Sequence, residues 1–407
     1  MLSRRTSVIL SVMKIKVKPE DFVVEEIADV APQKRGAFGL FLLEKRGWNT
    51  VDLLRRLSRA LGIPFSDFSY GGRKDRHALT RQYVAVKAQR MRNGEPRRIE
   101  VREEDYSLSF IGSSERPMGP DLIKGNRFSV TIRDVTEEAA GSALNGIEAV
   151  GQTGYPNYYD DQRFGSFDTR QGFIAEKIVK GHYNGALKIY LTHIRAADKG
   201  ADKDRRRFFF EHWGDWRTCL ESAKTLSERD SFSILVKDPK GFVPALQKIP
   251  GEEMSLFFSA YQSFLWNEVL RRVVKEKASA LRSSPGIAGD YLFYAGLTPE
   301  AFELLRTLAM PTPASGITMP DDLTQALYAD VLSERGIRPS LFNIRKIRQA
   351  FFKATERMAV VIPDELSWEA SVDELYRDRQ KLVLKFVLPR GSYATMFVKR
   401  LFSGGPA

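Results

Sequence analysis

Alternation of apolar and polar residues is concentrated at the two ends of this chain of 407 residues, whereas the middle follows a helical spacing. Alternation runs through residues 14–27 and 37–44 and returns at 381–388. Such period-two segments indicate strands that bury one face. The simplest topology is therefore one sheet domain made from both ends of the chain and interrupted by a mainly helical insertion.

The individual elements can be read from spacing and turn residues. Residues 82–87 and 126–133 alternate and are rich in β-branched and aromatic types, so we expect strands there. Residues 50–60 carry apolar side chains at helical spacing, with Asn49 or Thr50 as N-cap and Gly62 as the stop. Residues 392–398 are expected to form a strand that pairs with 381–388.

Strands outnumber helices in the first third of the chain and do not alternate regularly with them. This order predicts an α+β fold with a mixed, mostly antiparallel sheet rather than a doubly wound one. After residue 156 long helical stretches dominate, including 254–275. We expect a first sheet segment at 14–156, an insertion domain at 157–347 and a second sheet segment at 348–407, since a chain of this length exceeds a single core.

The chain is basic: 63 Lys and Arg against 51 Asp and Glu give a net charge of +12. Such an excess repels itself unless an anionic partner neutralises it, which makes nucleic acid the leading class of partner. From net charge alone, a basic enzyme without such a partner is an equal alternative.

Cysteine and histidine usage argues against metal and disulfide chemistry. The single cysteine, Cys219, excludes an intramolecular disulfide framework and fits a reducing cytoplasm. The four histidines show no spacing that places two ligands on one helix face. We expect no metal and no cofactor.

No run of about 18 apolar residues occurs, so no membrane-spanning helix is expected. Residues 1–13 are basic and lack acidic side chains. They are interpreted either as a transit peptide or as an extension ahead of the true initiator, Met13.

A local excess of positive charge lies between residues 71 and 98. It holds two acidic residues, Asp75 and Glu95, against nine basic ones. The basic residues are Arg73, Lys74, Arg76, Arg81, Lys87, Arg90, Arg92, Arg97 and Arg98. The segment suits phosphate binding, although a solvated strand and loop would have the same composition.

Asp75 stands among these cations, between Lys74 and Arg76. Neighbouring positive charge favours its anionic form. An ionised carboxylate is a poor general acid at neutral pH but a competent nucleophile or proton acceptor. The alternative is an ordinary surface ion pair.

The sequence GGRKDRHALTRQYVAV at 71–86 resembles the signature Gly-x-Lys-Asp-x-His-Ala-x-Thr-x-Gln of the TruD family of tRNA pseudouridine synthases. Four more segments are similar to family motifs and keep the family order. They are KVKPEDFVVEE at 16–26, KGNRF at 124–128, GYPNYYDDQRFGS at 154–166 and LPRGSYAT at 388–395. Residues 177–254 and 278–335 carry little resemblance.

Two positions depart from the family pattern. The family's Tyr-Phe-Gly is Tyr158-Tyr159-Asp160 here, and its Gly-Ser-Phe is Gly391-Ser392-Tyr393. A tyrosine stacks as a phenylalanine does and adds a hydroxyl donor, so the change affects details of base contact rather than the chemistry.

The resemblance implies an enzyme that isomerises uridine to pseudouridine in tRNA, at position 13 of the D-arm. It assigns Asp75 as the catalytic carboxylate. Lys16 and Lys74 become candidates for keeping that carboxylate ionised and for contacting phosphate. The implied partner is tRNA. We expect no association with a membrane, no required protein partner and a monomeric protein.

The target base has to leave the stack, which requires aromatic walls and polar groups that read its edge. Phe22, Phe128 and Tyr393 are the candidate walls, and Asn126 is the candidate amide. Each aromatic residue is equally well interpreted as strand core. Phe128 is the most ambiguous, because it alternates with Val130 and Ile132 as a buried strand face would.

Other basic residues leave both interpretations open. Arg163 either stabilises the junction to the insertion or binds phosphate, and we favour the structural role. Lys203 and residues 205–207 form a basic run. This run either binds a second part of the RNA or is a solvated surface. The alternative functions are the same chemistry on another RNA and a non-catalytic RNA-binding protein of the same fold.

Overall fold

The computed structural model describes residues 14–87, 98–195 and 198–406. The segment 1–13 with its two interpretations, and Arg90, Arg92 and Arg97, lie outside the described residues. The chain divides into two compact units. Unit 1 comprises 1–155 and 361–402, and unit 2 comprises 156–360 and 403–407.

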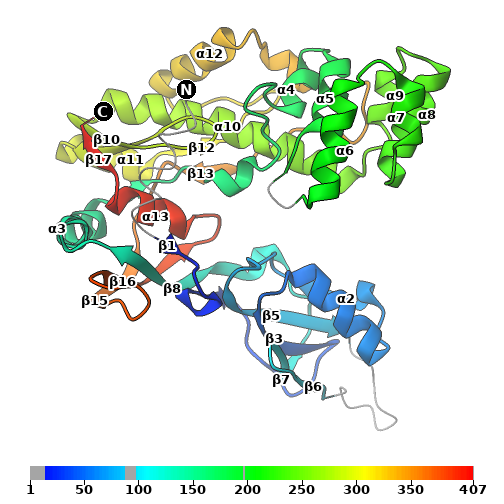
Figure 1. Ribbon diagram of the computed structural model, residues 1–407. Coiled ribbons are helices and arrows are strands. Elements are labelled where there is room, and N and C mark those ends of the chain that lie inside the picture. Colours follow the sequence, from blue (N-terminus) through cyan, green and yellow to red (C-terminus); the bar gives the residue numbers. More distant parts are fainter. Residues whose placement is uncertain (1–13, 88–97, 196–197, 407) are drawn as a thin grey trace. The chain divides into compact units, whose positions relative to one another are not determined.

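A ten-stranded sheet forms the centre of unit 1 (Figure 1). Its order is β15 (Asp364–Val372), β16 (Gln380–Pro389), β8 (Ile123–Val135), β2 (Phe22–Ala28), β5 (Leu79–Lys87), β3 (Phe38–Arg46), β7 (Tyr106–Ser114) and β6 (Glu100–Arg102). Two short strands join its sides, β1 (Lys14–Ile15) on β8 and β4 (Phe68–Tyr70) on β5. Only β2 and β5 run parallel among the described pairs of this sheet. The predicted α+β class with a mixed, mostly antiparallel sheet is confirmed.

Helix α2 (Thr50–Leu61) agrees with its sequence signals. It follows Asn49 and stops at Gly62, whose φ of 66° is left-handed and favours glycine. Its buried leucines, Leu53, Leu54 and Leu57, pack in one cluster with strand residues of β3, β5 and β7. Burial of this apolar face supplies most of the stability of such a helix.

The prediction of a strand at 392–398 is wrong. After the turn at Gly391 the chain forms helix α13 (Ala394–Leu401). Its buried residues include Ala394, Phe397 and Leu401, which recur at helical spacing. The Phe397 ring packs edge-on against Phe386 of β16 at 4.8 Å between centroids, so tertiary packing selects the helix.

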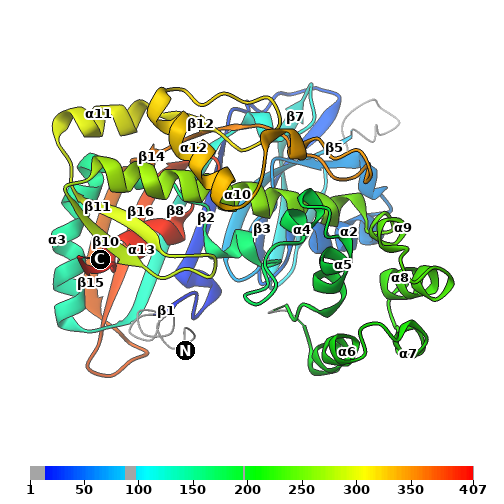
Figure 2. The ribbon, with the colours of Figure 1, turned by 90° about the horizontal axis from the view of Figure 1, so that it is seen from above.

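Cross-strand register shows which side chains share the face that α2 and α13 cover. Thr80 pairs with Val24, Val24 with Phe128, and Phe128 with Phe386. Paired residues project to the same side of a sheet. Helix α2 covers one end of this face and α13 the other, while α3 (Glu137–Thr153) packs on α13 and β16 (Figure 2).

Unit 2 is mainly helical. Helices α4 (Ile174–Val179), α5 (Tyr183–Thr192), α6 (Gly200–Glu211), α7 (Trp216–Glu221), α8 (Leu226–Lys237) and α9 (Phe242–Leu246) precede α10 (Gly251–Lys277), and α11 (Pro299–Thr307) and α12 (Asp322–Glu334) follow. The helix expected at 254–275 is confirmed as the long, largely buried α10. Among the described residues, no helix has the length and hydropathy that a membrane span requires.

Short strands complete unit 2. They are β10 (Ala280–Ser284), β11 (Tyr291–Gly296) and β17 (Gly404–Pro406) in one sheet and β12 (Ala309–Pro311) with β13 (Glu356–Met358) in another. The chain passes between the units three times: within β9 (Tyr155–Pro156), at β14 (Val360–Val361), and between Phe402 and Ser403, after α13.

A buried ion cluster ties the N-terminal segment of unit 1 to its C-terminal strands. The Arg133 guanidinium donates to Asp21 at 2.9 Å and to Asp373 at 3.0 Å. All three side chains are nearly inaccessible. Asp21 closes the 3-10 turn η1 (Pro19–Asp21), and Asp373 follows β15, so one cation joins segments more than 200 residues apart.

We predict that Arg133→Met lowers the free energy of unfolding by about 3–5 kcal/mol, because two carboxylates would be left buried without a cation. The matched control is Arg127→Met on the same strand, whose pair with Glu365 is exposed and should contribute less than about 1 kcal/mol. Urea unfolding of both variants measures the difference. Equal losses would contradict this role.

Candidate active site

The segment 71–78, which carries Asp75, connects β4 to β5 in unit 1. Thr50, the first residue of α2, accepts a hydrogen bond from the backbone N–H of Lys74 at 3.0 Å. The same hydroxyl donates to Gln82 Oε1 at 2.9 Å, and Gln82 Nε2 donates to the carbonyl of Gly72 at 3.2 Å. Thr50 and Gln82 are buried, so helix and sheet together fix the backbone of this loop.

Lys45 of β3 makes the most unusual contact with the loop. Its side chain is fully buried, and its Nζ donates to the Asp75 carbonyl oxygen at 2.8 Å and to that of Lys74 at 3.4 Å. Burial lowers the pKa of Lys45 from 10.5 to about 8, against the opposing attraction of Asp75. Lys45 was not predicted from the sequence, because a lysine in a strand ordinarily faces solvent.

The Asp75 carboxylate is paired with Lys16, whose Nζ lies 2.6 Å from Oδ2. The aspartate side chain is 37% exposed, so a substrate can reach it. Lys16 has a φ of 62°, a left-handed conformation that non-glycine residues rarely adopt and that tends to occur at functional sites. Its ammonium also lies 4.1 Å from the centroid of the Phe22 ring.

Lys74 points in a different direction from Lys16. Its Nζ contacts Glu26 Oε2 at 2.8 Å and donates to Asn126 Oδ1 at 2.5 Å. Its side chain is only 10% exposed, and that of Glu26 is inaccessible. Glu26 Oε1 in turn accepts from the backbone N–H of Tyr83, so strands β2, β5 and β8 meet in one polar network.

The predicted aromatic walls are placed as follows. Phe22 and Phe128 are buried and meet edge-to-face at 6.1 Å between centroids, and Phe128 stacks on Phe386 at 5.5 Å. Tyr393 is half-buried and directly precedes α13, and its backbone carbonyl accepts from the Tyr155 hydroxyl. Strand β16, which leads to Tyr393, ends opposite Gly125, next to Asn126.

Unit 1 therefore brings Asp75 together with Lys16 and Phe22, and places Lys74 with Asn126. This arrangement offers a reachable anionic carboxylate, an apolar wall and an oriented amide. No cluster of three or more His, Cys, Asp or Glu side chains suited to a metal ion occurs in the described part of the chain. Such a set can support nucleophilic or proton-transfer chemistry on a base.

Several basic residues of unit 2, for which the sequence allowed either a structural or an RNA-binding role, form contacts inside that unit. Arg163 Nε donates to Ser263 at 3.2 Å. Arg205 bonds Asp202 and Glu228, and Arg206 pairs with Asp198. Two of the arginines in the run 205–207 therefore hold helices together and are turned away from solvent.

We predict that stability depends on pH through Lys45. Between pH 8 and 10.5 the folded chain loses the Lys45 proton before the unfolded chain does, so the wild type gains stability with rising pH. Relative to Lys45→Met, this gain should approach about 3 kcal/mol at pH 10.5. Urea unfolding of both proteins from pH 7 to 10.5 measures it, with the exposed Lys87→Met as control. Parallel pH profiles for wild type and Lys45→Met would contradict the burial of a titrating ammonium.

Comparison with known proteins places this site in a family. Residues 10–401 match the profile of the family described as tRNA pseudouridine synthase D (TruD). The chain is 34% identical over 399 residues to probable tRNA pseudouridine synthase D 1 of Methanococcus maripaludis, with 96% of this chain and 100% of the relative covered. It is 33% identical to probable tRNA pseudouridine synthase D 2 of Methanocaldococcus jannaschii, with 96% and 92% covered.

A solved structure agrees with these matches. The crystal structure assigned to tRNA pseudouridine synthase D (TruD) from Methanosarcina mazei superposes with a TM-score of 0.72 at 25% identity, covering 96% of this chain and 93% of that one. The resemblance that the five motifs indicated is therefore confirmed. The chain belongs to the tRNA pseudouridine synthase D (TruD) family.

Proposed function

We propose that this chain converts uridine to pseudouridine in tRNA, at position 13 of the D-arm, with Asp75 as the catalytic carboxylate. The N1–C1′ bond breaks, the base rotates, and C5 joins C1′, while the C5 proton is released and N1 gains one. No net redox change or hydrolysis occurs, so no cofactor is required. The observation that carries the proposal is the reachable Asp75 carboxylate, paired with Lys16 on a loop that buried residues fix.

Three roles for Asp75 are consistent with this arrangement. The carboxylate attacks C1′ or C6 to form a covalent bond, or it takes the 2′ proton on the way to a glycal. Each role requires the anionic form, and Lys16 at 2.6 Å supplies the matching cation. Lys16 is thus the residue that we propose pairs with the Asp75 carboxylate and orients it before the substrate arrives.

We propose that the flipped uracil rests against Tyr393, with Phe22 and Phe128 forming the wall behind it. Tyr393 is half-buried, so part of its ring is available for stacking. Phe22 and Phe128 are buried in the sheet face and would shape the wall through packing. The aromatic residues thus divide between a contact surface and its support.

The Asn126 amide has an orientation that its neighbour dictates. An ammonium group can only donate, so the amide atom that faces Lys74 at 2.5 Å must be the oxygen. The Nδ2 hydrogens are then directed elsewhere, and we propose that they donate to the O4 carbonyl of uracil. Cytosine carries an amino group at position 4, which cannot accept such a bond. Lys74, held by buried Glu26, is on this account a positioning residue rather than a phosphate ligand.

Two alternatives make different demands on the site. The same chemistry on another RNA would use the same residues and differ only in the uridine selected. A non-catalytic RNA-binding protein has no need of a carboxylate in a basic loop, where it repels phosphate. The intact Asp75–Lys16 pair therefore favours an enzyme, which we further propose acts as a cytoplasmic monomer without a protein partner.

For Asp75→Ala we predict that pseudouridine formation in purified tRNA is abolished while the Kd for tRNA stays within about tenfold of wild type. Phosphate contacts and base flipping do not require the carboxylate. Single-turnover assays and filter binding measure the two quantities. Retained turnover would contradict the assignment of Asp75.

Asn126→Asp tests the amide, because a carboxylate keeps the Lys74 contact but removes the two donor hydrogens. We predict that kcat/KM falls about 10–100-fold, as expected for a lost hydrogen bond to the base. Affinity for tRNA carrying cytidine at the target position should rise relative to uridine, since the carboxylate accepts from the cytosine amino group. An unchanged cytidine-to-uridine ratio alongside lost stability would indicate a purely structural role.

A further inference from the structure

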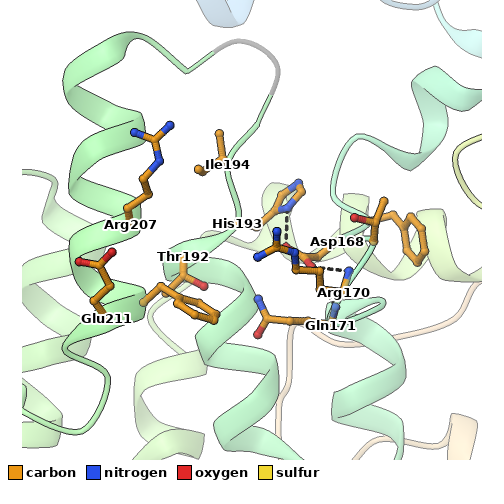
Figure 3. A pocket seen from close by; sticks show the side chains of 11 residues that line it. Asp168, Arg170, Gln171, Thr192, His193, Ile194, Arg207 and Glu211 are labelled. Carbon is orange, nitrogen blue, oxygen red and sulfur yellow. Dashed lines mark hydrogen bonds and ion pairs between the residues drawn. The ribbon is translucent and has the colours of Figure 1, made fainter. Parts of the chain in front are cut away.

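A pocket of about 680 Å³ opens in unit 2, between the segment 167–171 and helix α6, far along the chain from Asp75 (Figure 3). Its size lies within the range of about 300–1,000 Å³ that ligand sites occupy. Arg170 and Gln171 line one side, Arg207 and Glu211 project from α6, and His193 lies between them. Nothing in the proposed chemistry at Asp75 uses these residues.

His193 forms a rigid part of this pocket. Its Nδ1 lies 3.0 Å from Asp168 Oδ2, and its Nε2 lies 3.3 Å from the carbonyl oxygen of Gly165. An ionised carboxylate and a carbonyl can only accept, so both contacts are hydrogen bonds when the imidazole carries both protons. Because Nε2 faces a carbonyl, this Asp–His pair is not arranged as a general base.

Asp168 is fully engaged by its surroundings. Its Oδ1 accepts from the backbone N–H groups of Arg170 and Gln171, at 2.9 Å each. Burial alone would raise the pKa of Asp168, but the hydrogen bonds from His193 and from these backbone groups lower it below its usual value. The carboxylate therefore holds the segment and His193 in place.

The open side of the pocket combines cations with exposed apolar surface. Arg170 is exposed, and Arg207 is exposed although it contacts Asp204. Phe210 is 45% and Ile194 37% exposed, and the ammonium of Lys188 lies 4.3 Å from the Phe210 ring centroid. Planar guanidinium groups match phosphate oxygens, and an exposed ring offers a stacking surface for a base.

We propose that this pocket binds one unstacked nucleotide of the tRNA, with its phosphate at Arg170 and its base against Phe210. The inference rests on the proposed function for the identity of the RNA. The combination of arginine forks and an exposed aromatic ring is typical of single-stranded RNA recognition.

Arg170→Glu and Phe210→Ala test the proposal, with Lys240→Glu as a matched charge reversal at an exposed site outside the pocket. Both pocket variants should weaken tRNA binding, Phe210→Ala by about 5- to 100-fold. Arg170→Glu should also make the salt dependence of Kd shallower by about one ion. KM should rise by a similar factor, while kcat at saturating tRNA stays within about twofold of wild type, since neither residue belongs to the site at Asp75.

The outcomes separate this proposal from the function on which it rests. If the wild type binds tRNA but forms no pseudouridine, the proposed reaction fails while the binding comparison still tests the pocket. If both pocket variants bind tRNA as Lys240→Glu does, the pocket proposal is overturned. Binding of uridine 5′-monophosphate is measured with the same proteins. If the pocket variants lose this binding relative to wild type but keep its tRNA affinity, the proposal is also overturned, and the pocket is assigned to a small phosphate ligand.

Discussion

The hydrogen bond from the buried Lys45 ammonium to the backbone carbonyl of Asp75 is the contact on which the geometry of the site depends. A fully buried lysine is costly, because burial penalises its charged form. The compensation here is a donor that reaches the backbone of the loop from β3, where Thr50 and Gln82 hold neighbouring groups. The loop backbone is thereby fixed while the Asp75 side chain remains accessible to a substrate.

Strand register explains why a polar network lies within an otherwise apolar sheet face. Glu26 pairs with Asn126 across β2 and β8, and helices α2 and α13 pack against the two ends of that face. Lys74 reaches them from the loop, where it forms an ion pair with Glu26 and donates a hydrogen bond to Asn126. Buried polar groups without partners are strongly destabilising, so this network specifies one arrangement of loop and sheet. The group proposed to read the base, Asn126, and the group proposed to act on it, Asp75, are therefore held by the same sheet.

Much of the fold could be predicted from periodicity, as α2 and the strands around Phe22 and Phe128 show. Helix α13 was missed because the segment 392–398 stops short of Leu401, which completes the helical spacing that Ala394 and Phe397 begin. Asp75, Lys16 and Asn126 were reached through family motifs. Lys45 was missed although it alternates with the buried Phe41 and Leu43, because a lysine in a strand is ordinarily assigned to the solvent face. The role of Lys74 likewise depends on Glu26, 48 positions away along the chain.

The most direct test of the central claim is transcriptome-wide mapping of pseudouridine in total RNA incubated with wild-type or Asp75→Ala protein. The RNA should come from cells that lack an endogenous enzyme of this family, so that new sites are attributable to the added protein. The account predicts one modified uridine in the tRNA D-arm, at position 13, with wild type and none with the variant. Sites that persist with the variant, or modification only outside tRNA, would contradict it.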